Sequence, residues 1–306
     1  MIPEVSVIIP VFNRENLIIE TLKSVKNQIF SNWECCIVDD GSTDNSIKNI
    51  QSFIQRDERF KLIRRSLESK KGAASCRNIG LQNTSAKFIQ FLDSDDIISE
   101  NKIRNQLNLL KESDEFSIST CVWGRFGKGL PDNLFLKQSS YSNYTNSEDF
   151  LNSLKGSKGY FPPHAYLMQR KLIEKVGPWN ENLSLNDDGE FMMRIIANTT
   201  EIKCALESIA WYRLPEKNNL SNYGNIEAVN SAILSWKLVD NSLKIRFKKK
   251  RIEYVEWAKG RLFINVKKSF PELIEFHKPF FTEQIRHTRR QNSLYSRVIR
   301  KISQKF

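Results

Sequence analysis

The sequence predicts an α/β fold built on a mostly parallel sheet flanked by helices. Short runs of β-branched and aromatic residues alternate with segments whose apolar residues recur at helical spacing. Such alternation is typical of consecutive strand–helix–strand units with right-handed crossovers. With 306 residues, 40% of them hydrophobic, the chain can form one large domain with an appendage, or two domains.

The regular alternation covers the first 92 residues. Apolar runs predict strands at Val5–Ile9 (ended by Pro10), Trp33–Val38, Phe60–Ile63 and Lys87–Leu92. Helical spacing predicts helices at Asn16–Gln28, after the capping stretch Thr43–Ser46, and at Gly72–Leu81.

The pattern loosens beyond residue 97, and residues 138–147 are expected to form a loop. Further helices are expected at Glu100–Lys111, Lys171–Val176 and Phe191–Asn198, and further strands at Val122–Phe126, His164–Gln169 and Ile209–Arg213. From about residue 226 onward the apolar spacing is helical, with breaks near Pro271 and Pro279.

The positive charge is concentrated near the C-terminus. Residues 241–306 hold 18 Lys/Arg and 5 Asp/Glu, so the remainder of a chain of net charge +12 sums to −1. This basic region is either a solvated helical surface or a contact for an anionic membrane or nucleic acid. No apolar run is long enough to span a membrane, and the N-terminus lacks a secretory signal pattern. A cytoplasmic protein is therefore expected, with its five cysteines reduced.

Three acidic clusters follow strands or precede helices. The apolar run before Asp93 stops abruptly at Asp93, Asp95 and Asp96. Two carboxylates about 5 Å apart repel by about 3 kcal/mol at an effective dielectric near 20, and a divalent cation relieves that repulsion. The other clusters are Asp39–Asp40, and Asp187–Asp188 with Glu190. The first two should meet at the carboxyl edge of the sheet, where open α/β sheets bind ligands.

Five motifs in this order resemble the family 2 glycosyltransferases, which have the GT-A fold. The motifs are Val5–Asn13, Ile37–Asp44, Ala74–Gly80, Phe91–Asp96 and Asn186–Phe191. The resemblance implies a GT-A domain at residues 1–215, followed by a basic helical region at 216–306. It also implies a metal-dependent, inverting transfer of a sugar from a nucleotide donor, UDP-linked, to a hydroxyl acceptor.

The resemblance implies that the first two motifs bind the nucleotide. Pro10, Phe12 and Asn13 would form the loop over the base, and Asp40 would accept a hydrogen bond from a uracil-like N–H. Asp39 would support that loop. A turn that caps the next helix is the structural alternative for Asp39 and Asp40.

The remaining motifs would bind the phosphates and the metal and would supply the catalytic base. Arg77 would lie near the phosphates, and a surface ion pair is its alternative. Asp93 and Asp95 match the family's Asp-X-Asp motif for Mn²⁺ or Mg²⁺; Asp95 would be the direct ligand, while Asp93 and Ser94 would also contact the nucleotide. Asp188 matches the catalytic base, and the positive end of its helix is expected to keep it ionised.

Acceptor contacts are the least determined feature. His164, Trp179 and Asp187 are candidates, although a core position is the safer interpretation of Trp179, and a lone histidine such as His164 is more often a packed or surface residue. Gly189 replaces the aromatic residue often found after the base. Near the C-terminus, an apolar stripe from Leu294 to Phe306 with basic residues opposite would suit an anionic membrane surface or pack on the domain.

The expected partners are a nucleotide sugar and a glycan or lipid-linked saccharide, in bacterial surface polysaccharide synthesis at the inner face of the membrane. A nucleotidyltransferase is one rival, but the loop after the first strand lacks the glycine-rich, basic character that it requires. A non-catalytic sugar- or nucleic-acid-binding protein is the other. Nucleic acid is not expected, because the basic region lacks aromatic residues on a β platform.

Overall fold

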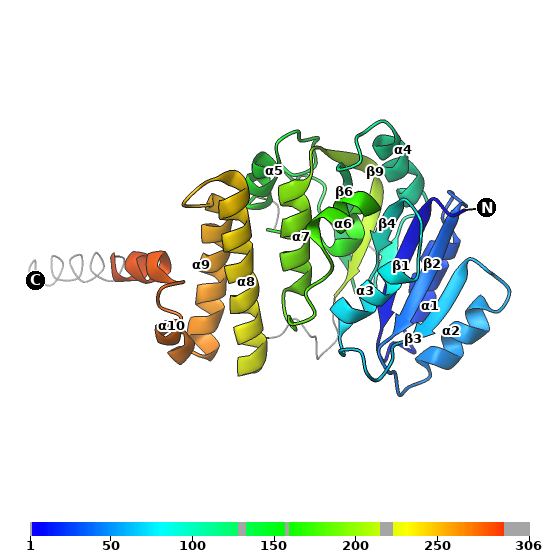
Figure 1. Cartoon of the computed structure of the whole chain (residues 1–306), viewed down its shortest axis with the longest axis horizontal. Helices are drawn as coiled ribbons and strands as arrows, with labels where there is room; N and C mark the ends of the chain where they lie inside the picture. The colour runs from blue at the N-terminus through cyan, green and yellow to red at the C-terminus, as the bar shows by residue number, and fades with distance from the viewer. Residues whose placement is uncertain (1, 128–132, 157–158, 215–222, 291–306) are drawn as a thin grey trace, which may run out of the picture.

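The computed structural model describes residues 2–127, 133–156, 159–214 and 223–290. Within them, one mixed sheet of strand order β3-β2-β1-β4-β8-β6-β9-β5 runs through the molecule, with β7 paired to β6. The first four strands in this order are parallel, and β8 is antiparallel to both of its neighbours. The predicted α/β class with a mostly parallel sheet is therefore confirmed (Figure 1).

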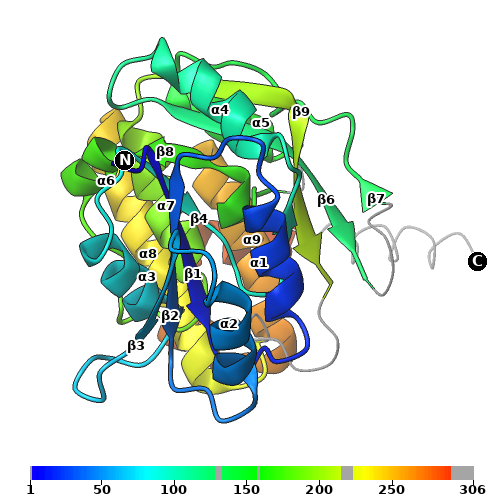
Figure 2. The ribbon, with the colours of Figure 1, turned by 90° about the vertical axis from the view of Figure 1, so that its right-hand side faces the viewer.

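The N-terminal elements match the predicted alternation of strand and helix. In chain order they are β1 (Val5–Val11), α1 (Ile18–Lys26), β2 (Trp33–Asp39), α2 (Ser46–Ile54), β3 (Phe60–Arg64), α3 (Ala73–Gln82) and β4 (Phe88–Phe91). The strands lie edge to edge, with α1 and α2 on one side and α3 on the other (Figure 2).

The second half contains the strands that complete the sheet. Its elements are β5 (Ile97–Ile98), α4 (Lys102–Lys111), β6 (Ile118–Phe126), β7 (Asn133–Leu134), α5 (Ser147–Leu154), η1 (Pro163–Ala165), β8 (Leu167–Gln169), α6 (Arg170–Val176), α7 (Asp187–Asn198) and β9 (Ile202–Arg213). Helix α5 was not predicted, because its few apolar residues follow a stretch rich in Ser and Asn. Its start is capped by Asn146, whose side chain accepts from Glu148 N.

Several predicted boundaries were wrong, and β6 and β9 each begin earlier in the sequence than predicted. Pro10 does not end the first strand but pairs with Val38 inside β1. The backbone of Ile8 faces β4 and accepts from Leu92 N, so Pro10, two residues on, faces the same side. Pairing with β4 ends at Ile8 and Phe91, so the donor that proline lacks is not needed there.

The strand predicted at His164–Gln169 begins later. His164 lies in the short 3₁₀ turn η1, and only Leu167–Gln169 pair as strand β8. Pro163 occupies the first position of that turn, where its missing N–H costs nothing and its fixed φ is suitable.

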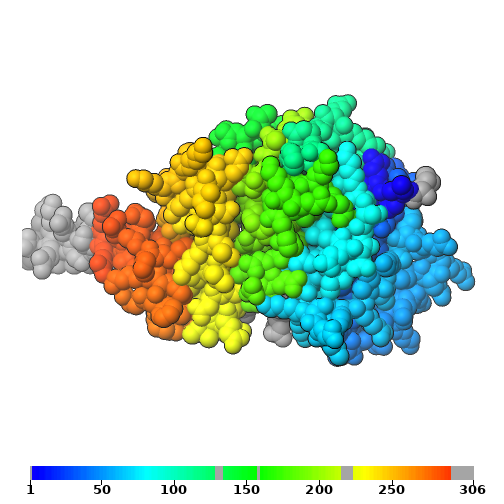
Figure 3. Space-filling model, viewed as in Figure 1, coloured from blue at the N-terminus to red at the C-terminus, as the bar shows by residue number. Residues whose placement is uncertain are grey.

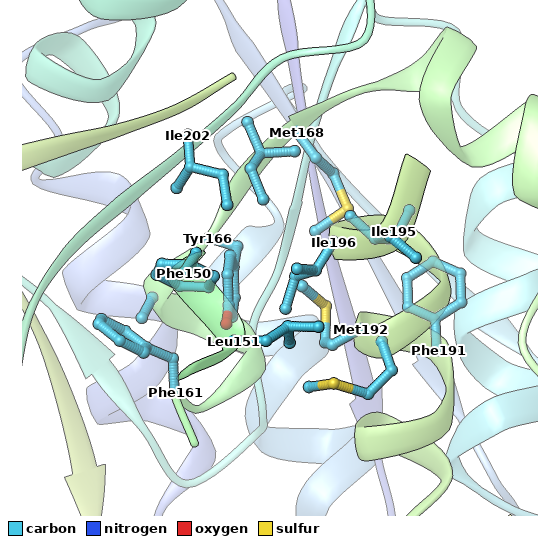
Figure 4. Packing of buried hydrophobic residues seen from close by; sticks show 14 of the residues in the cluster. Phe150, Leu151, Phe161, Tyr166, Met168, Phe191, Met192, Ile195, Ile196 and Ile202 are labelled. Atoms are coloured by element: carbon cyan, nitrogen blue, oxygen red, sulfur yellow. The ribbon is translucent and has the colours of Figure 1, made fainter. Parts of the chain in front are cut away.

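Both faces of the sheet are buried, as parallel strands require. Alternate residues of β1 belong to different hydrophobic clusters: Val7 and Ile9 pack with α1 and α4, whereas Ile8 packs with α3 and α7. The larger cluster brings together aromatic and aliphatic side chains from α5, β8 and α7, including Phe150, Tyr166 and Phe191 (Figure 4). This rigid core fixes where β4 ends and where α7 begins.

The C-terminal region is helical, as predicted. Helices α8 (Ile226–Phe247), α9 (Glu253–Ser269) and α10 (Glu272–Phe276) follow the sheet, and α8 lies along α7. In the described part of the chain no helix is both long and apolar enough to cross a membrane. The basic stripe expected from Leu294 to Phe306, and the domain boundary expected at residue 215, lie outside the described residues. All five cysteines are free, and Cys204 is less buried than the others.

Two glycines should respond oppositely to alanine. A Cβ at Gly80 of α3 would lie 2.3 Å from Cγ2 of Ile8, a stiff β-branched residue with no exposed surface. Gly80→Ala should therefore cost about 1–3 kcal/mol of unfolding free energy, measured by urea denaturation. Gly260→Ala in α9 meets nothing within 4 Å and should gain about 0.5–1 kcal/mol. Equal effects at the two positions would contradict this packing of α3 on β1.

Candidate active site

The ends of β1 and β2 form one hydrogen-bonded pair of loops. Asn13, in the left-handed region at φ 50°, accepts from Thr43 N at 2.8 Å, and its own N–H donates to Ser42 Oγ at 3.0 Å. Asp39 accepts from Gly41 N and Ser42 N, both at 3.1 Å. Asp39 therefore shapes the turn in the way that the sequence predicted. Asp44, not the Asp39–Asp40 pair, accepts from Ser46 N at the start of α2.

Asp40 is held by the segment after β3. Its carboxylate forms an ion pair with Arg65 and accepts from Gly72 N, with Oδ2 at 3.0 Å. Gly72 has φ 129°, a conformation that favours glycine. Asp40 is 7% exposed, so most of its carboxylate is buried against these partners.

Phe12 forms the outer edge of this part of the site. Its ring is 38% exposed, and Lys71 Nζ lies 4.4 Å from the ring centroid. Pro10, in contrast, is buried within β1. Of the three residues expected to form the loop over the base, Phe12 and Asn13 therefore reach the surface, and Pro10 supports them from below.

Arg77 connects two of the acidic clusters. Its Nη2 lies 2.7 Å from Asp93 Oδ1 after β4, and its Nη1 lies 3.0 Å from Asp187 Oδ2 at the start of α7. The guanidinium also lies over the Trp179 ring, 4.3 Å from its centroid. Its side chain is 6% exposed, so this is neither a surface pair nor an open phosphate contact. A planar fork with several donors is suited to bridging two carboxylates.

Asp95 lies on the open side of this arrangement. Its nearest cation is Arg14, with Nε at 3.3 Å from Oδ2, and its side chain is 29% exposed. Burial, together with the charges of Asp96 and Asp93, raises the pKa of Asp95 to about 6. Burial also opposes ionisation of Asp93, yet Arg77 leaves the pKa of Asp93 below its usual value. The repulsion inferred from the sequence is therefore concentrated on Asp95.

Asp96 points inward, where it holds three segments together. Its Oδ1 accepts from Arg213 N at 2.7 Å, and its Oδ2 lies 3.0 Å from His164 Nδ1. Arg213 also donates through Nε to Asp95 O. Asp96 and His164 are 1% and 0% exposed, so His164 supports the acidic loop from beneath and does not face an acceptor.

Asp188, in the first turn of α7, is also strongly affected by its surroundings. Burial and the charge of Asp187 raise the pKa of Asp188 to about 6, against the opposing effect of Arg77. The helix N-terminus was expected to keep this carboxylate ionised. Desolvation and a like charge raise its pKa despite that dipole, and a pKa of about 6 still leaves it mostly ionised at pH 7. A carboxylate with a pKa near 6 is a good general base at neutral pH.

The other predicted acceptor residues occupy different surroundings. Trp179 stacks on Phe191 with centroids 4.1 Å apart and is 2% exposed, which is a core position. The carboxylate of Asp187 forms an ion pair with Arg77. Glu190 pairs with Arg194 within α7, and Ser94 is buried in the turn after β4.

A divalent cation fits the site only in one mode. Within the described part of the chain, no three His, Cys, Asp or Glu side chains are grouped so that they could hold a metal ion. Mg²⁺ commonly binds through one or two carboxylates, with phosphate oxygens completing its coordination. Asp95 is partly exposed and is crowded by like charges. Asp95, with Asp93 beside it, fits that mode.

Sequence reasoning missed Arg14 and Arg65. Arg65 directly follows β3 and Arg14 lies in the loop after β1, both at the edge of the sheet where the acidic clusters were expected. A basic residue at the same strand edge as an acidic cluster was the available signal. The structure thus places the clusters at Asp93 and Asp187 on either side of Arg77, whereas Asp40 is paired separately with Arg65.

Comparison with known proteins shows the family of the chain. The family model described as Glycosyl transferase family 2 matches residues 6–177. The chain is 40% identical over 110 residues to UDP-Glc:alpha-D-GlcNAc-diphosphoundecaprenol beta-1,3-glucosyltransferase WfgD of Escherichia coli, covering 36% of this chain and 42% of that protein. The chain spans less than half the length of the curated relatives it matches.

Solved structures share the fold. S. aureus TarS 1-349 in complex with UDP-GlcNAc superposes with a TM-score of 0.63 at 18% identity, covering 87% of this chain and 81% of that one. Mannosyltransferase PcManGT from Pyrobaculum calidifontis, in complex with GDP-Man and Mn²⁺, gives a TM-score of 0.57 at 14% identity, covering 93% and 84%. These likenesses show that the sheet and its helices have the GT-A arrangement.

Removing the Arg77 cation should destabilise the fold strongly. Arg77→Met leaves Asp93 and Asp187 without a buried partner, so we expect a loss of about 3 kcal/mol in unfolding free energy at pH 7. Arg77→Lys should recover only part of it, because an ammonium cannot bridge both carboxylates. Arg286→Met, which breaks an exposed pair, should change stability by less than about 0.5 kcal/mol. A loss at Arg77 as small as that at Arg286 would contradict the bridge.

Proposed function

Because the chain belongs to glycosyl transferase family 2, we propose that it transfers a sugar from a nucleotide-sugar donor to an acceptor hydroxyl, with inversion at the anomeric carbon. One observation carries this proposal. Arg77 holds Asp93, beside the expected diphosphate site, and Asp187, beside the expected base, on either side of one guanidinium. Because one guanidinium contacts both Asp93 and Asp187, the donor and acceptor sites would be adjacent, as a direct displacement requires.

The donor is proposed to be UDP-linked. The nucleotide base would stack on Phe12, and Asp40, oriented by Arg65 and Gly72, would accept the imide N–H of uracil. The name of the Escherichia coli relative and the ligand of the S. aureus structure both support a uridine nucleotide. The GDP-Man bound by the Pyrobaculum structure is the alternative that a binding assay would separate.

Asp188 is proposed to be the general base. Its carboxylate takes the proton of the acceptor hydroxyl as that oxygen forms a bond to the anomeric carbon. The bond from the anomeric carbon to the diphosphate oxygen breaks on the opposite face, and the nucleoside diphosphate leaves with the electron pair. The pKa of Asp188, about 6, leaves the base mostly deprotonated at pH 7 and still able to accept a proton.

Asp95 and Asp93 are proposed to hold Mn²⁺ or Mg²⁺ together with the diphosphate. When bound, the ion would stabilise the negative charge of the departing diphosphate. Arg14 would then lie beside the same charge, since its Nε is already 3.3 Å from Asp95. Asp96 would take no part, because His164 and Arg213 N occupy it.

The acceptor is proposed to be a glycan or a lipid-linked saccharide of a bacterial surface polysaccharide. The name of the Escherichia coli relative, with its diphosphoundecaprenol-linked sugar, supports this class. In α9 and the segment that follows, exposed basic residues such as Lys267, Lys268 and Arg289 could contact the anionic surface that carries such an acceptor. This would place the enzyme at the inner face of the membrane.

Release of UDP from UDP-glucose or UDP-GlcNAc, measured with and without Mn²⁺, tests the proposed reaction. A transferase with water as a poor acceptor should release UDP slowly, and faster with the metal. Binding of UDP without any release would favour the non-catalytic alternative.

Asp188→Asn should abolish turnover while the affinity for UDP is retained. Loss of the base should lower the rate of UDP release by about 10²–10⁴-fold, with the affinity for UDP changed less than about threefold. In the unsubstituted protein the rate should fall as the pH drops below about 6, because protonated Asp188 cannot accept a proton. Lost UDP binding in the variant would contradict the role of base.

The same substitution should stabilise the fold. A carboxyl whose folded pKa lies near 6 rather than 3.8 destabilises the folded state above pH 6, and this penalty disappears as the pH falls below its ordinary pKa. Asp188→Asn should therefore gain about 1–2 kcal/mol at pH 7. Asp149→Asn, in the exposed first turn of α5, should instead lose up to about 1 kcal/mol. A loss at both positions would contradict the raised pKa.

Asp95→Ala should weaken UDP binding only when metal is present. By calorimetry with Mn²⁺ the Kd for UDP should rise at least about tenfold, equivalent to about 1.4 kcal/mol. With EDTA the variant and the unsubstituted protein should agree within about twofold, because without the metal the carboxylate makes no favourable contact with the diphosphate. Equal affinities in the presence of Mn²⁺ would rule out Asp95 as a ligand.

A further inference from the structure

The loop before the proposed base is held by a helix beyond the family match. Helix α8 lies along α7 (Figure 3, where the yellow helix lies against the green one). Ser231 of α8 accepts from two consecutive backbone groups of that loop, Ser184 N at 2.8 Å and Leu185 N at 3.1 Å. Ser231 is only 8% exposed, so without its hydroxyl these two N–H groups would lose a buried acceptor.

One helical turn further along, Ser235 contacts the next residue of the loop. Its Oγ donates to Asn186 O at 2.9 Å and accepts from Asn186 Nδ2 at 2.7 Å. Asn186 has φ 62°, in the left-handed region that most side chains avoid. Ser235 is completely buried, so this two-way contact fixes both the backbone and the side chain of Asn186.

The contact continues into the first turn of α7. A Cβ on Gly189 would lie 2.3 Å from Asn186 Oδ1, so the side chain of Asn186 lies directly over this glycine. Gly189 N in turn donates to Asp188 Oδ1 at 2.8 Å. This explains why glycine replaces the aromatic residue expected after the base: any side chain would displace Asn186. An unbroken series of contacts runs from Ser235 through Asn186 to the residue that bonds Asp188.

We propose that Ser231 and Ser235 are positioning residues that hold the loop 184–186 so that Asp188 meets the acceptor hydroxyl. The inference rests on the proposed function. The loop 184–186, Asp188 and α8 all lie beyond residues 6–177, so the family match covers neither the proposed base nor its support. The spacing of four residues puts both hydroxyls on the same face of α8, toward the loop.

Two measurements on the full chain test the positioning role. Ser231→Ala should make the amides of Ser184 and Leu185 exchange with deuterium at least about tenfold faster. It should also lower kcat for UDP release from UDP-glucose with Mn²⁺ at least about fivefold, with KM for UDP-glucose within about twofold. Ser231→Thr keeps the hydroxyl and should restore both values. Ser242→Ala, about 10 Å beyond Ser235 along α8, is the matched control and should change neither the amide exchange nor kcat.

Asn186→Gly provides a second variant that should fold normally. Glycine adopts the left-handed backbone readily, so this change removes only the side-chain contact to Ser235. We expect a loss in kcat of about threefold or more with unchanged UDP affinity.

Each outcome decides the proposal. Unchanged amide exchange in Ser231→Ala would show that no clamp exists. Faster exchange with kcat unchanged would show that the clamp does not position the base, and either result overturns the inference. An unsubstituted protein that binds UDP but releases none from UDP-glucose or UDP-GlcNAc would count against the proposed function. In that case amide exchange alone still decides whether α8 holds the loop.

Discussion

The candidate site depends on one buried guanidinium. Arg77 contacts Asp93 after β4 and Asp187 at the start of α7, two loops that lie 94 residues apart in the sequence. Without this cation, four carboxylates would converge at the end of the sheet with little compensation, and folding would oppose their approach. The raised pKa values of Asp95 and Asp188, each about 6, show that the compensation is incomplete. Such residual strain is common where a site is built to bind a ligand or move a proton.

The fold was largely predictable because local patterns and burial agree. Both faces of β1, β2 and β4 are covered, so their apolar runs are nearly continuous and easily recognised. The predictions failed where context outweighs pattern. Pro10 is tolerated inside β1 because β4 has already ended beside it. Helix α5 is short and begins after a polar stretch, so only its packing reveals it.

The acids of the site and Arg77 were predictable from the sequence, whereas Arg14 and Arg65 were missed. Acidic residues directly after strands stand out in a sequence, because burial cannot explain them. Arg65 and Arg14 have no such signature, since an arginine after a strand is normally a surface residue. Trp179 and His164 lie inside the molecule, where they support the site rather than line it. The contacts of Ser231 and Ser235 with the loop before α7 depend on how α8 docks, which no local pattern encodes.

The most direct measurement is a crystal structure of the full chain with UDP and Mn²⁺. We predict that the ion and the diphosphate lie against Asp95 and Asp93, that the uracil reaches Asp40, and that Asp188 faces the open side of the diphosphate. Nucleotide bound away from these carboxylates, or a diphosphate separated from Asp95, would contradict the arrangement on which the proposed transferase depends.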